Sequence, residues 1–259
     1  MSDLTPTPAA SRLPAALRAM RPRQWVKNVL VLAAPVAAGS LFQVPVLVST
    51  AWAFLAFCLI SASIYLVNDV RDVEADRQHP KKRLRPIAAG ELSVRTALIL
   101  AAACLIASLV LSWLVTPLLA LTVAVYWLLQ VGYSLFLKNE PIIDLAMVAS
   151  GFLLRAVAGG VASGIELSQW FLLVAAFGSL FMVAGKRCSE ISELGAEAGT
   201  RASLARYTAT YLRFVWMFSA VLMVAFYSLW AFDQRHGDVW SVPWTWVSIA
   251  PFTLAILSY

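Results

Sequence analysis

Three aspartates stand close together between two long apolar runs of the sequence. Asp69, Asp72 and Asp76 are spaced i, i+3 and i+7, so on one unbroken helix they share a face. Asn68 directly precedes the first of them and adds an amide oxygen. Mg²⁺ prefers such hard oxygen ligands, and it commonly combines one or two carboxylates with the phosphate oxygens of a substrate. The spacing therefore predicts that these four side chains bind Mg²⁺ and that the three aspartates are catalytic. The alternative is a solvated helix end with ordinary surface charges.

A run of cations follows the aspartates. The stretch "HPKKRLRP", residues 79–86, is bracketed by two prolines and predicts a loop rather than a helix. Lys and Arg next to a metal site can neutralise the phosphate groups of a bound substrate. We therefore expect Lys82, Arg83 and Arg85 to bind substrate. That these cations only mark one side of a membrane remains the alternative.

A second group of candidate residues lies in "YSLFLKNEPIIDLAMVASGFLLRAVAGG", residues 133–160. Asp144 and Arg155 fall on one helical stripe, about 16 Å apart by helical rise. A buried Arg costs roughly 2.5–3.5 kcal/mol at the centre of a membrane, so Arg155 needs an anionic partner or a water-filled cavity. We expect it to bind the anionic part of a substrate; the alternative is a structural pair with an acid on another helix.

Two further basic clusters stand at the ends of apolar runs. "RPRQWVKN" contains Lys27, and "AGKRCSE" contains Lys186 and Arg187. We expect these three side chains to bind substrate, although anchoring of helix ends at the membrane surface explains them equally well. Together with the cations above, they exceed what one metal-bound diphosphate requires.

Composition and hydropathy indicate the scaffold that must position these residues. The chain of 259 residues is 61% hydrophobic and 13% charged, whereas soluble domains carry about 25% charged residues. A membrane-spanning helix needs about 20 apolar residues. The sequence predicts an all-α integral membrane protein with eight spans, at residues 24–42, 45–69, 95–114, 118–137, 141–162, 168–185, 211–231 and 244–259.

The distribution of Lys and Arg predicts the orientation. Eighteen of the 20 fall in the N-terminal segment or in alternate connections, which the positive-inside rule assigns to the cytoplasm. We therefore expect a multi-pass protein of the plasma (inner) membrane with its N-terminus and active site cytoplasmic. Residues 1–20 should form a disordered cytoplasmic head and residues 21–259 a single transmembrane catalytic domain. Because the last span is apolar to its end, we also expect a further final helix.

The pattern NDxxDxxxD followed by RxRPxxxG, residues 68–90, resembles the first signature of the UbiA-type intramembrane prenyltransferase superfamily. The resemblance implies nine transmembrane helices around a central cavity open to the cytoplasmic side, of which eight are visible here. It also implies that the aspartates bind Mg²⁺, which holds the diphosphate of a substrate. Tyr133, Lys138 and Asp144 fit the start of the second signature. Val148 departs from it, because many aromatic prenyltransferases carry a second acid at that position.

Other stretches, among them "RPRQWVKN", "GFLLRAVAGG" and "FGSLFMVAGKR", resemble the branch of the superfamily that transfers phosphoribose in cell-wall arabinan synthesis. The resemblance implies phosphoribosyl pyrophosphate as donor, a polyprenyl phosphate such as decaprenyl phosphate as acceptor, and pyrophosphate as leaving group. Tyr133 and Asp144 would orient the sugar, and Lys138, like the other cations, would bind an anionic end.

Two other functions stay open. The first is prenyl transfer from a prenyl diphosphate to an aromatic acceptor, which the acidic motif allows but the surplus of cations disfavours. The second is a transporter, since intramembrane charges occur there too; the acids cluster at one membrane face, and we find no convincing inverted repeat. No nucleic-acid partner is expected. The sequence leaves the oligomeric state open, and a homo-oligomer is among the states it allows.

Overall fold

The computed structural model describes residues 13–137, 141–194, 207–234 and 244–259. Within these ranges the chain is helical and has no strand, which confirms the predicted all-α fold class. Six of the helices described are long and apolar enough to cross a membrane. They are α3 (Val44–Arg71), α5 (Val94–Val115), α6 (Pro117–Gly132), α7 (Pro141–Ser163), α8 (Gln169–Leu194) and α9 (Ala209–Asp233).

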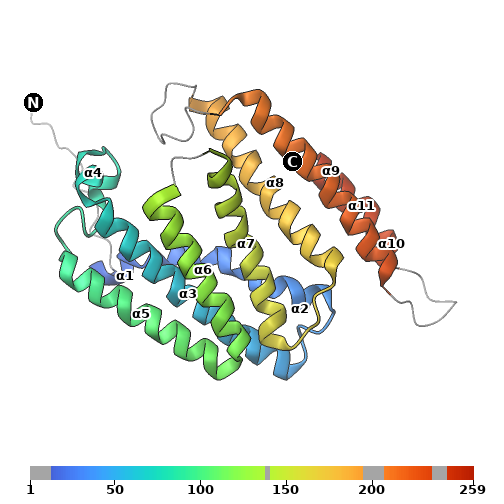
Figure 1. Cartoon of the computed structure of the whole chain (residues 1–259), viewed down its shortest axis with the longest axis horizontal. Helices are drawn as coiled ribbons and strands as arrows, with labels where there is room; N and C mark the ends of the chain where they lie inside the picture. The colour runs from blue at the N-terminus through green and yellow to red at the C-terminus, as the bar shows by residue number, and fades with distance from the viewer. Residues whose placement is uncertain (1–12, 138–140, 195–206, 235–243) are drawn as a thin grey trace, which may run out of the picture.

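Shorter elements connect and flank these six helices. They are α1 (Ala15–Ala19), the 3₁₀ segment η1 (Pro22–Leu32), α2 (Ala33–Ala37), α4 (Val73–Gln78), the 3₁₀ turn η2 (Lys82–Leu84), the π-helical turn η3 (Tyr133–Leu137), α10 (Trp244–Val247) and α11 (Ile249–Leu257). Figure 1 shows α5, α3, α6, α7, α8 and α9 in succession across the molecule, with α10 and α11 beside α9. In the same view η1 and α2 cross behind α6 and α7, and they pack against α7.

Local sequence signals explain where several helices begin. The hydroxyls of Ser93, Thr116 and Thr208 each accept a hydrogen bond from the backbone N–H three residues later, so they cap α5, α6 and α9. Pro117 occupies the first turn of α6, where its missing N–H has no helical partner to lose. These caps therefore fix the residue at which each of the three helices begins.

The first and last predicted spans differ in form from a single long α-helix. Residues 24–42 contain most of η1 and then α2, and residues 244–259 contain α10 and α11, which meet at Ser248. Prolines account for both interruptions. Pro35 lies inside α2 and Pro251 in the first turn of α11, and each removes a backbone donor from a continuous helical ladder.

Part of the predicted disordered head is ordered. Residues 1–12 lie outside the described ranges, but Ala15–Ala19 forms α1. Ala19 is buried in an apolar cluster with Leu66 of α3 and Ile87. The prediction of disorder up to residue 20 is therefore wrong for α1, because the segment has an apolar face that the sequence alone did not pair with a partner.

The predicted continuous helix through Asn68 and Asp76 is also wrong. Helix α3 ends at Arg71, Asp72 adopts a non-helical backbone (φ −91°, ψ 10°), and α4 begins at Val73. The i, i+3, i+7 face therefore does not exist as a regular helical stripe. What the break brings together instead is described below.

Close approach of η1 to α7 depends on one glycine. A Cβ atom at Gly159 would overlap the backbone carbonyl oxygen of Val31. Val31 is fully buried, and η1 and α7 pack along this contact. The absence of a side chain at 159 thus lets η1 lie against α7 and sets the position of Asn28, three residues before Val31.

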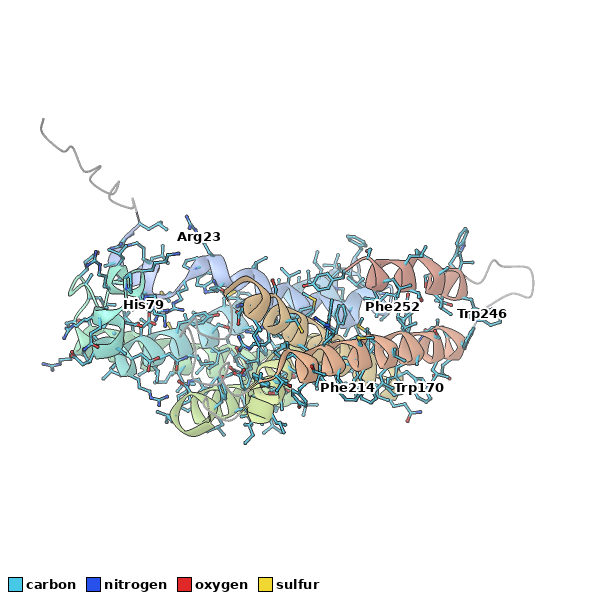
Figure 2. All side chains as sticks on the ribbon, turned by 90° about the horizontal axis from the view of Figure 1, so that it is seen from above. Arg23, His79, Trp170, Phe214, Trp246 and Phe252 are labelled. Atoms are coloured by element: carbon cyan, nitrogen blue, oxygen red, sulfur yellow. The ribbon has the colours of Figure 1, made fainter. Side chains whose placement is uncertain are left out.

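Exposed aromatic side chains mark the part of the molecule that holds α9 to α11. Figure 2 shows Trp170, Trp246 and Phe252 toward the end opposite Arg23 and His79, with Phe214 nearer the middle. Phe214 on α9 is 62% exposed, as expected for a helix face that meets lipid rather than water. His79 directly follows α4, so α4 lies at the end away from these aromatic side chains.

Candidate active site

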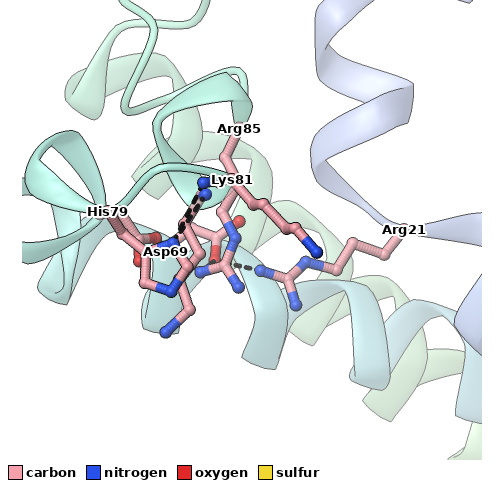
Figure 3. A network of polar contacts seen from close by, with 7 residues as sticks. Arg21, Asp69, His79, Lys81 and Arg85 are labelled. Carbon is pink, nitrogen blue, oxygen red and sulfur yellow. Dashed lines mark hydrogen bonds and ion pairs between the residues drawn. The ribbon is translucent and has the colours of Figure 1, made fainter. Parts of the chain in front are cut away.

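Asp69 and Asp76 converge on one guanidinium despite the helix break between them. Both are almost fully buried, at 2% and 3% exposure. Nη1 of Arg85 donates to Oδ1 of Asp69 at 3.1 Å and to Oδ2 of Asp76 at 2.5 Å. Figure 3 shows Arg85 and Arg21 approaching Asp69 from different segments of the chain. Two of the predicted aspartates thus converge, with Arg85 between their carboxylates.

Asn68 carries an oxygen without a hydrogen-bond partner. Its Oδ1 is buried and accepts no hydrogen bond within the structure, while Asp72 beside the helix break is half-buried. Burying such an acceptor unpaired is costly, which marks it as a candidate ligand atom. In the part of the chain that the structure describes, no three Asp, Glu, His or Cys side chains lie close enough to form a metal site. The three aspartates that the sequence spacing grouped together therefore do not lie close enough to one another in this structure to form a metal site by themselves.

Arg21 belongs to the same cluster, and our sequence analysis did not select it. Its guanidinium donates to Asp69 and lies over the ring of Tyr65, 5.1 Å from the centroid. Arg21 also has a φ of 54°, the only positive φ of a non-glycine residue in the described ranges. Such strain persists where surrounding contacts fix it, commonly at functional sites. The sequence did contain one signal for this backbone conformation. Arg21 directly precedes Pro22, and the residue before a proline is disfavoured in a helical conformation.

The cations after α4 form a turn above the acidic cluster. The backbone N–H of Lys82 donates to Nδ1 of His79 at 3.3 Å, and that of Arg83 donates to the His79 carbonyl at 3.1 Å. Lys82 is half-buried and Arg83 is exposed. His79 therefore shapes the η2 turn by accepting hydrogen bonds from the backbone of that turn (Figure 3). The predicted loop between the two prolines is confirmed.

Asp144 is the centre of a second, buried cluster. It is fully buried and forms an ion pair with Arg187, with Nη2 of Arg187 3.0 Å from its Oδ2. Its carboxylate accepts hydrogen bonds from Nε of Arg187 at 3.2 Å and from the Tyr133 hydroxyl. Arg187 also donates to Glu190 at 2.8 Å. Burial, with the charge of Asp144 as a second cause, raises the pKa of Tyr207 next to this cluster, so its phenol stays protonated.

The expected role of Tyr133 and Asp144 in orienting a sugar stays a prediction. In this structure neither lines the two cavities described next, and the Asp144 carboxylate is paired with Arg187. A substrate would have to break this buried ion pair to reach the carboxylate. The pair holds Arg187 on α8 against α7.

Arg155 lies in the core with neutral partners. Its Nε donates to Oδ1 of Asn28 at 2.8 Å, Nη1 to the Gly151 carbonyl at 2.6 Å and Nη2 to the Tyr126 hydroxyl at 2.7 Å. It is 5% exposed and lies 4.8 Å from the centroid of the Tyr126 ring. Among the described residues no carboxylate pairs with it. Asn28 and Tyr126 were missed by the sequence analysis, because nothing local marks them as partners of a residue on α7.

Two cavities lie on either side of α7. The smaller, of about 180 Å³, is lined by Asn68, Tyr65 and Arg155 among others. The larger, of about 860 Å³, lies between α7, α8 and α9, and its lining includes Lys186 and Arg187. Lys27 is exposed and lines both cavities. Lys186 is 68% exposed, with its Nζ 3.8 Å from Glu190. Lys138, the remaining predicted residue, lies outside the described ranges.

Relatives of known name resemble the chain over most of its length. A decaprenyl-phosphate phosphoribosyltransferase of Corynebacterium glutamicum is 55% identical over 250 residues, covering 94% of this chain and 75% of the relative. The enzyme of the same name from Mycobacterium tuberculosis is 50% identical over 263 residues, covering 99% and 86%.

The fold has counterparts among solved structures. A UbiA homologue from Archaeoglobus fulgidus, solved with DMAPP and Mg²⁺, superposes with a TM-score of 0.76 at 19% identity, covering 95% of this chain and 85% of the other. The sequence model of the UbiA prenyltransferase family matches residues 29–259. The chain therefore belongs to the UbiA prenyltransferase family, and it is a multi-pass membrane protein with the all-helical fold of that family.

Proposed function

We propose that this protein transfers phosphoribose from phosphoribosyl pyrophosphate to a polyprenyl phosphate such as decaprenyl phosphate. The observation that carries the proposal is Arg155, a buried cation that faces a cavity next to the acidic cluster and has only neutral partners among the described residues. An unneutralised guanidinium in a membrane interior is costly unless an anion joins it. The identity of 50–55% to enzymes named decaprenyl-phosphate phosphoribosyltransferase supports the same reaction.

The number of anionic groups favours this reaction over prenyl transfer to a neutral aromatic acceptor. A prenyl diphosphate brings one anionic group. Phosphoribosyl pyrophosphate brings a pyrophosphate and a separate phosphate, and the lipid acceptor brings a third. The chain offers cations at three places, with Arg85 at the acidic cluster, Arg155 in the small cavity, and Lys186 with Arg213 in the large cavity. Val148, where many aromatic prenyltransferases carry an acid, adds no competing carboxylate.

The residues of the acidic cluster fit a divalent metal. Asn68 has a buried oxygen without a partner among the described residues, the carboxylates of Asp69 and Asp76 converge on Arg85, and Asp72 lies at the helix break between them; all four offer the hard oxygen atoms that Mg²⁺ prefers. We assign Mg²⁺ binding to these four residues, in keeping with the Mg²⁺ in the Archaeoglobus fulgidus structure. When bound, the metal supplies positive charge to the departing pyrophosphate.

The chain's own residues then bind and orient the two substrates. Arg85 and Arg21, released from the carboxylates, are placed to bind the pyrophosphate, and Lys82 and Arg83 of the η2 turn lie next to them. Arg155 binds the remaining anionic group of the donor. The phosphate oxygen of the lipid attacks C1 of the ribose while the bond from C1 to the pyrophosphate oxygen breaks, and pyrophosphate leaves with the electron pair.

Two consequences follow for the reaction. The lipid phosphate is already ionised near neutral pH, so the attack needs no general base from the protein. In-line displacement inverts the configuration at the anomeric carbon. We further propose that this site faces the cytoplasm, because 18 of the 20 Lys and Arg residues fall in the N-terminal segment or in connections on that side.

The test is direct transfer by the purified protein. Radiolabelled phosphoribosyl pyrophosphate, decaprenyl phosphate and Mg²⁺ should give a labelled lipid with an inverted anomeric centre, and a parallel reaction with prenyl diphosphate and an aromatic acceptor should give no product. A label that stays in the aqueous phase while the prenyl reaction proceeds would overturn the proposal in favour of prenyl transfer.

A further inference from the structure

We infer that the large cavity between α7, α8 and α9 binds the phosphate of the lipid acceptor, with Arg213 as a principal ligand. This inference rests on the proposed function and divides the two substrates between the two cavities. Arg213 lies in the first turns of α9 and lines the large cavity. None of our sequence-based site predictions included it.

The charge of Arg213 is not neutralised within the described ranges. No hydrogen bond or ion pair joins it to another described residue. Glu190 supplies the only carboxylate side chain among the described residues of the cavity wall, and it already contacts Arg187 at 2.8 Å and Lys186 at 3.8 Å. The wall therefore carries an excess of positive charge. Such a wall attracts an anion, and a guanidinium recognises the oxygens of a phosphate through paired N–H groups.

The other side chains of this cavity suit a lipid phosphate rather than the donor. Among the described residues no aspartate lines either cavity, but Asn68, which directly precedes Asp69, lines the small one and not the large one. Met182, Val183 and Trp216 provide apolar surface next to the cations. A cavity of about 860 Å³ with cations and apolar walls fits a phosphate monoester on an alkyl chain, which needs no metal ligand.

The two cavities share the wall where transfer would occur. Lys27, Val148 and Phe152 line both. An anionic acceptor in one cavity and an anionic donor in the other would meet at Val148, with Lys27 placed to offset their mutual repulsion. A carboxylate at position 148 would repel both. The valine is therefore consistent with two charged substrates.

The test measures the KM of each substrate separately. Arg213→Gln should raise the KM for decaprenyl phosphate about tenfold or more, because it removes hydrogen bonds to a charged group. The KM for phosphoribosyl pyrophosphate should change by no more than about twofold. Arg213→Lys should restore part of the loss. Arg95→Gln, which removes an exposed cation at the start of α5 outside both cavities, should behave like the parent protein. An unchanged KM for the lipid, or an equal rise for both substrates, would overturn the inference.

Direct binding separates the lipid from free phosphate. Decaprenyl phosphate in detergent should bind the parent protein without donor, and Arg213→Gln should weaken this binding about tenfold. If the substitution weakens inhibition by inorganic phosphate but leaves lipid binding unchanged, the cavity takes free phosphate and the inference is wrong. If the parent protein binds the lipid through Arg213 but transfers no phosphoribose, the proposed function fails while the lipid site stands.

Discussion

Asp69 and Asp76 lie on different helices and yet share the guanidinium of Arg85. The sequence spacing suggested a single helical face, but the break at Asp72 turns the chain so that the two buried carboxylates meet at one cation. In this arrangement Arg85 provides the positive charge that a metal would otherwise supply. On the proposed function, metal binding at these carboxylates would release Arg85 toward a substrate phosphate.

Removing Arg85 should make stability depend on metal. Arg85→Ala leaves two buried carboxylates facing each other, and the loss of the charged hydrogen bonds should cost roughly 1–3 kcal/mol in the presence of a chelator. Mg²⁺ should recover much of that loss. Thermal unfolding in detergent, with and without Mg²⁺, measures the difference; a variant that Mg²⁺ stabilises no more than the parent would contradict the coupling.

Arg155 should control donor binding. Arg155→Ala removes the buried cation of the small cavity, and the affinity for phosphoribosyl pyrophosphate should fall about tenfold or more. Titration calorimetry with the donor and Mg²⁺ measures it, with Arg95→Gln as the control for a lost positive charge. Unchanged affinity for the donor would show that Arg155 only ties Asn28 and Tyr126 together.

The buried pair of Asp144 and Arg187 should matter for folding. Arg187→Met leaves the Asp144 carboxylate buried without its cation, which costs about 3–5 kcal/mol in comparable cases. Replacing both partners, in the double variant Arg187→Met with Asp144→Leu, should restore much of this stability. The midpoints of unfolding of the single and double variants give the comparison. A double variant as unstable as the single one would contradict the ion-pair assignment.

Gly159 should be intolerant of a side chain, since η1 lies directly against it. Gly159→Ala would push the carbonyl of Val31 away and displace Asn28 from Arg155, with a loss of about 1–3 kcal/mol, as is typical of overpacked sites. Gly132→Ala is the matched control, because a Cβ there meets no atom within 4 Å. Equal stability of the two variants would show that η1 can shift freely.

Sequence patterns predicted the apolar helices well and the contacts between them poorly. Six long apolar helices follow from hydropathy alone, because each must satisfy its backbone internally in lipid. The acidic cluster was found because its residues are close in sequence. Asn28, Tyr126 and Arg21 were missed, since each contributes through a partner more than 25 residues away along the chain.

The errors have the same origin. The break at Asp72 could not be read from the helical period, because it depends on the fold. The fold alone also reveals that Arg187, 43 residues after Asp144, pairs with its carboxylate. The Asp76 carboxylate is oriented by its hydrogen bond from Arg85. The position of Arg85 in turn depends on the η2 turn that directly precedes it.

The turnover of Asp76→Asn in the presence of Mg²⁺ tests the central claim most directly. Asparagine keeps the size of the side chain and one oxygen but removes the charge that pairs with Arg85 and that, on the proposed function, binds the metal. Loss of this electrostatic stabilisation should lower the rate of phosphoribose transfer to decaprenyl phosphate about a hundredfold or more, in a protein that unfolds at a temperature close to that of the parent. A folded variant that transfers phosphoribose at the parent rate would contradict the account.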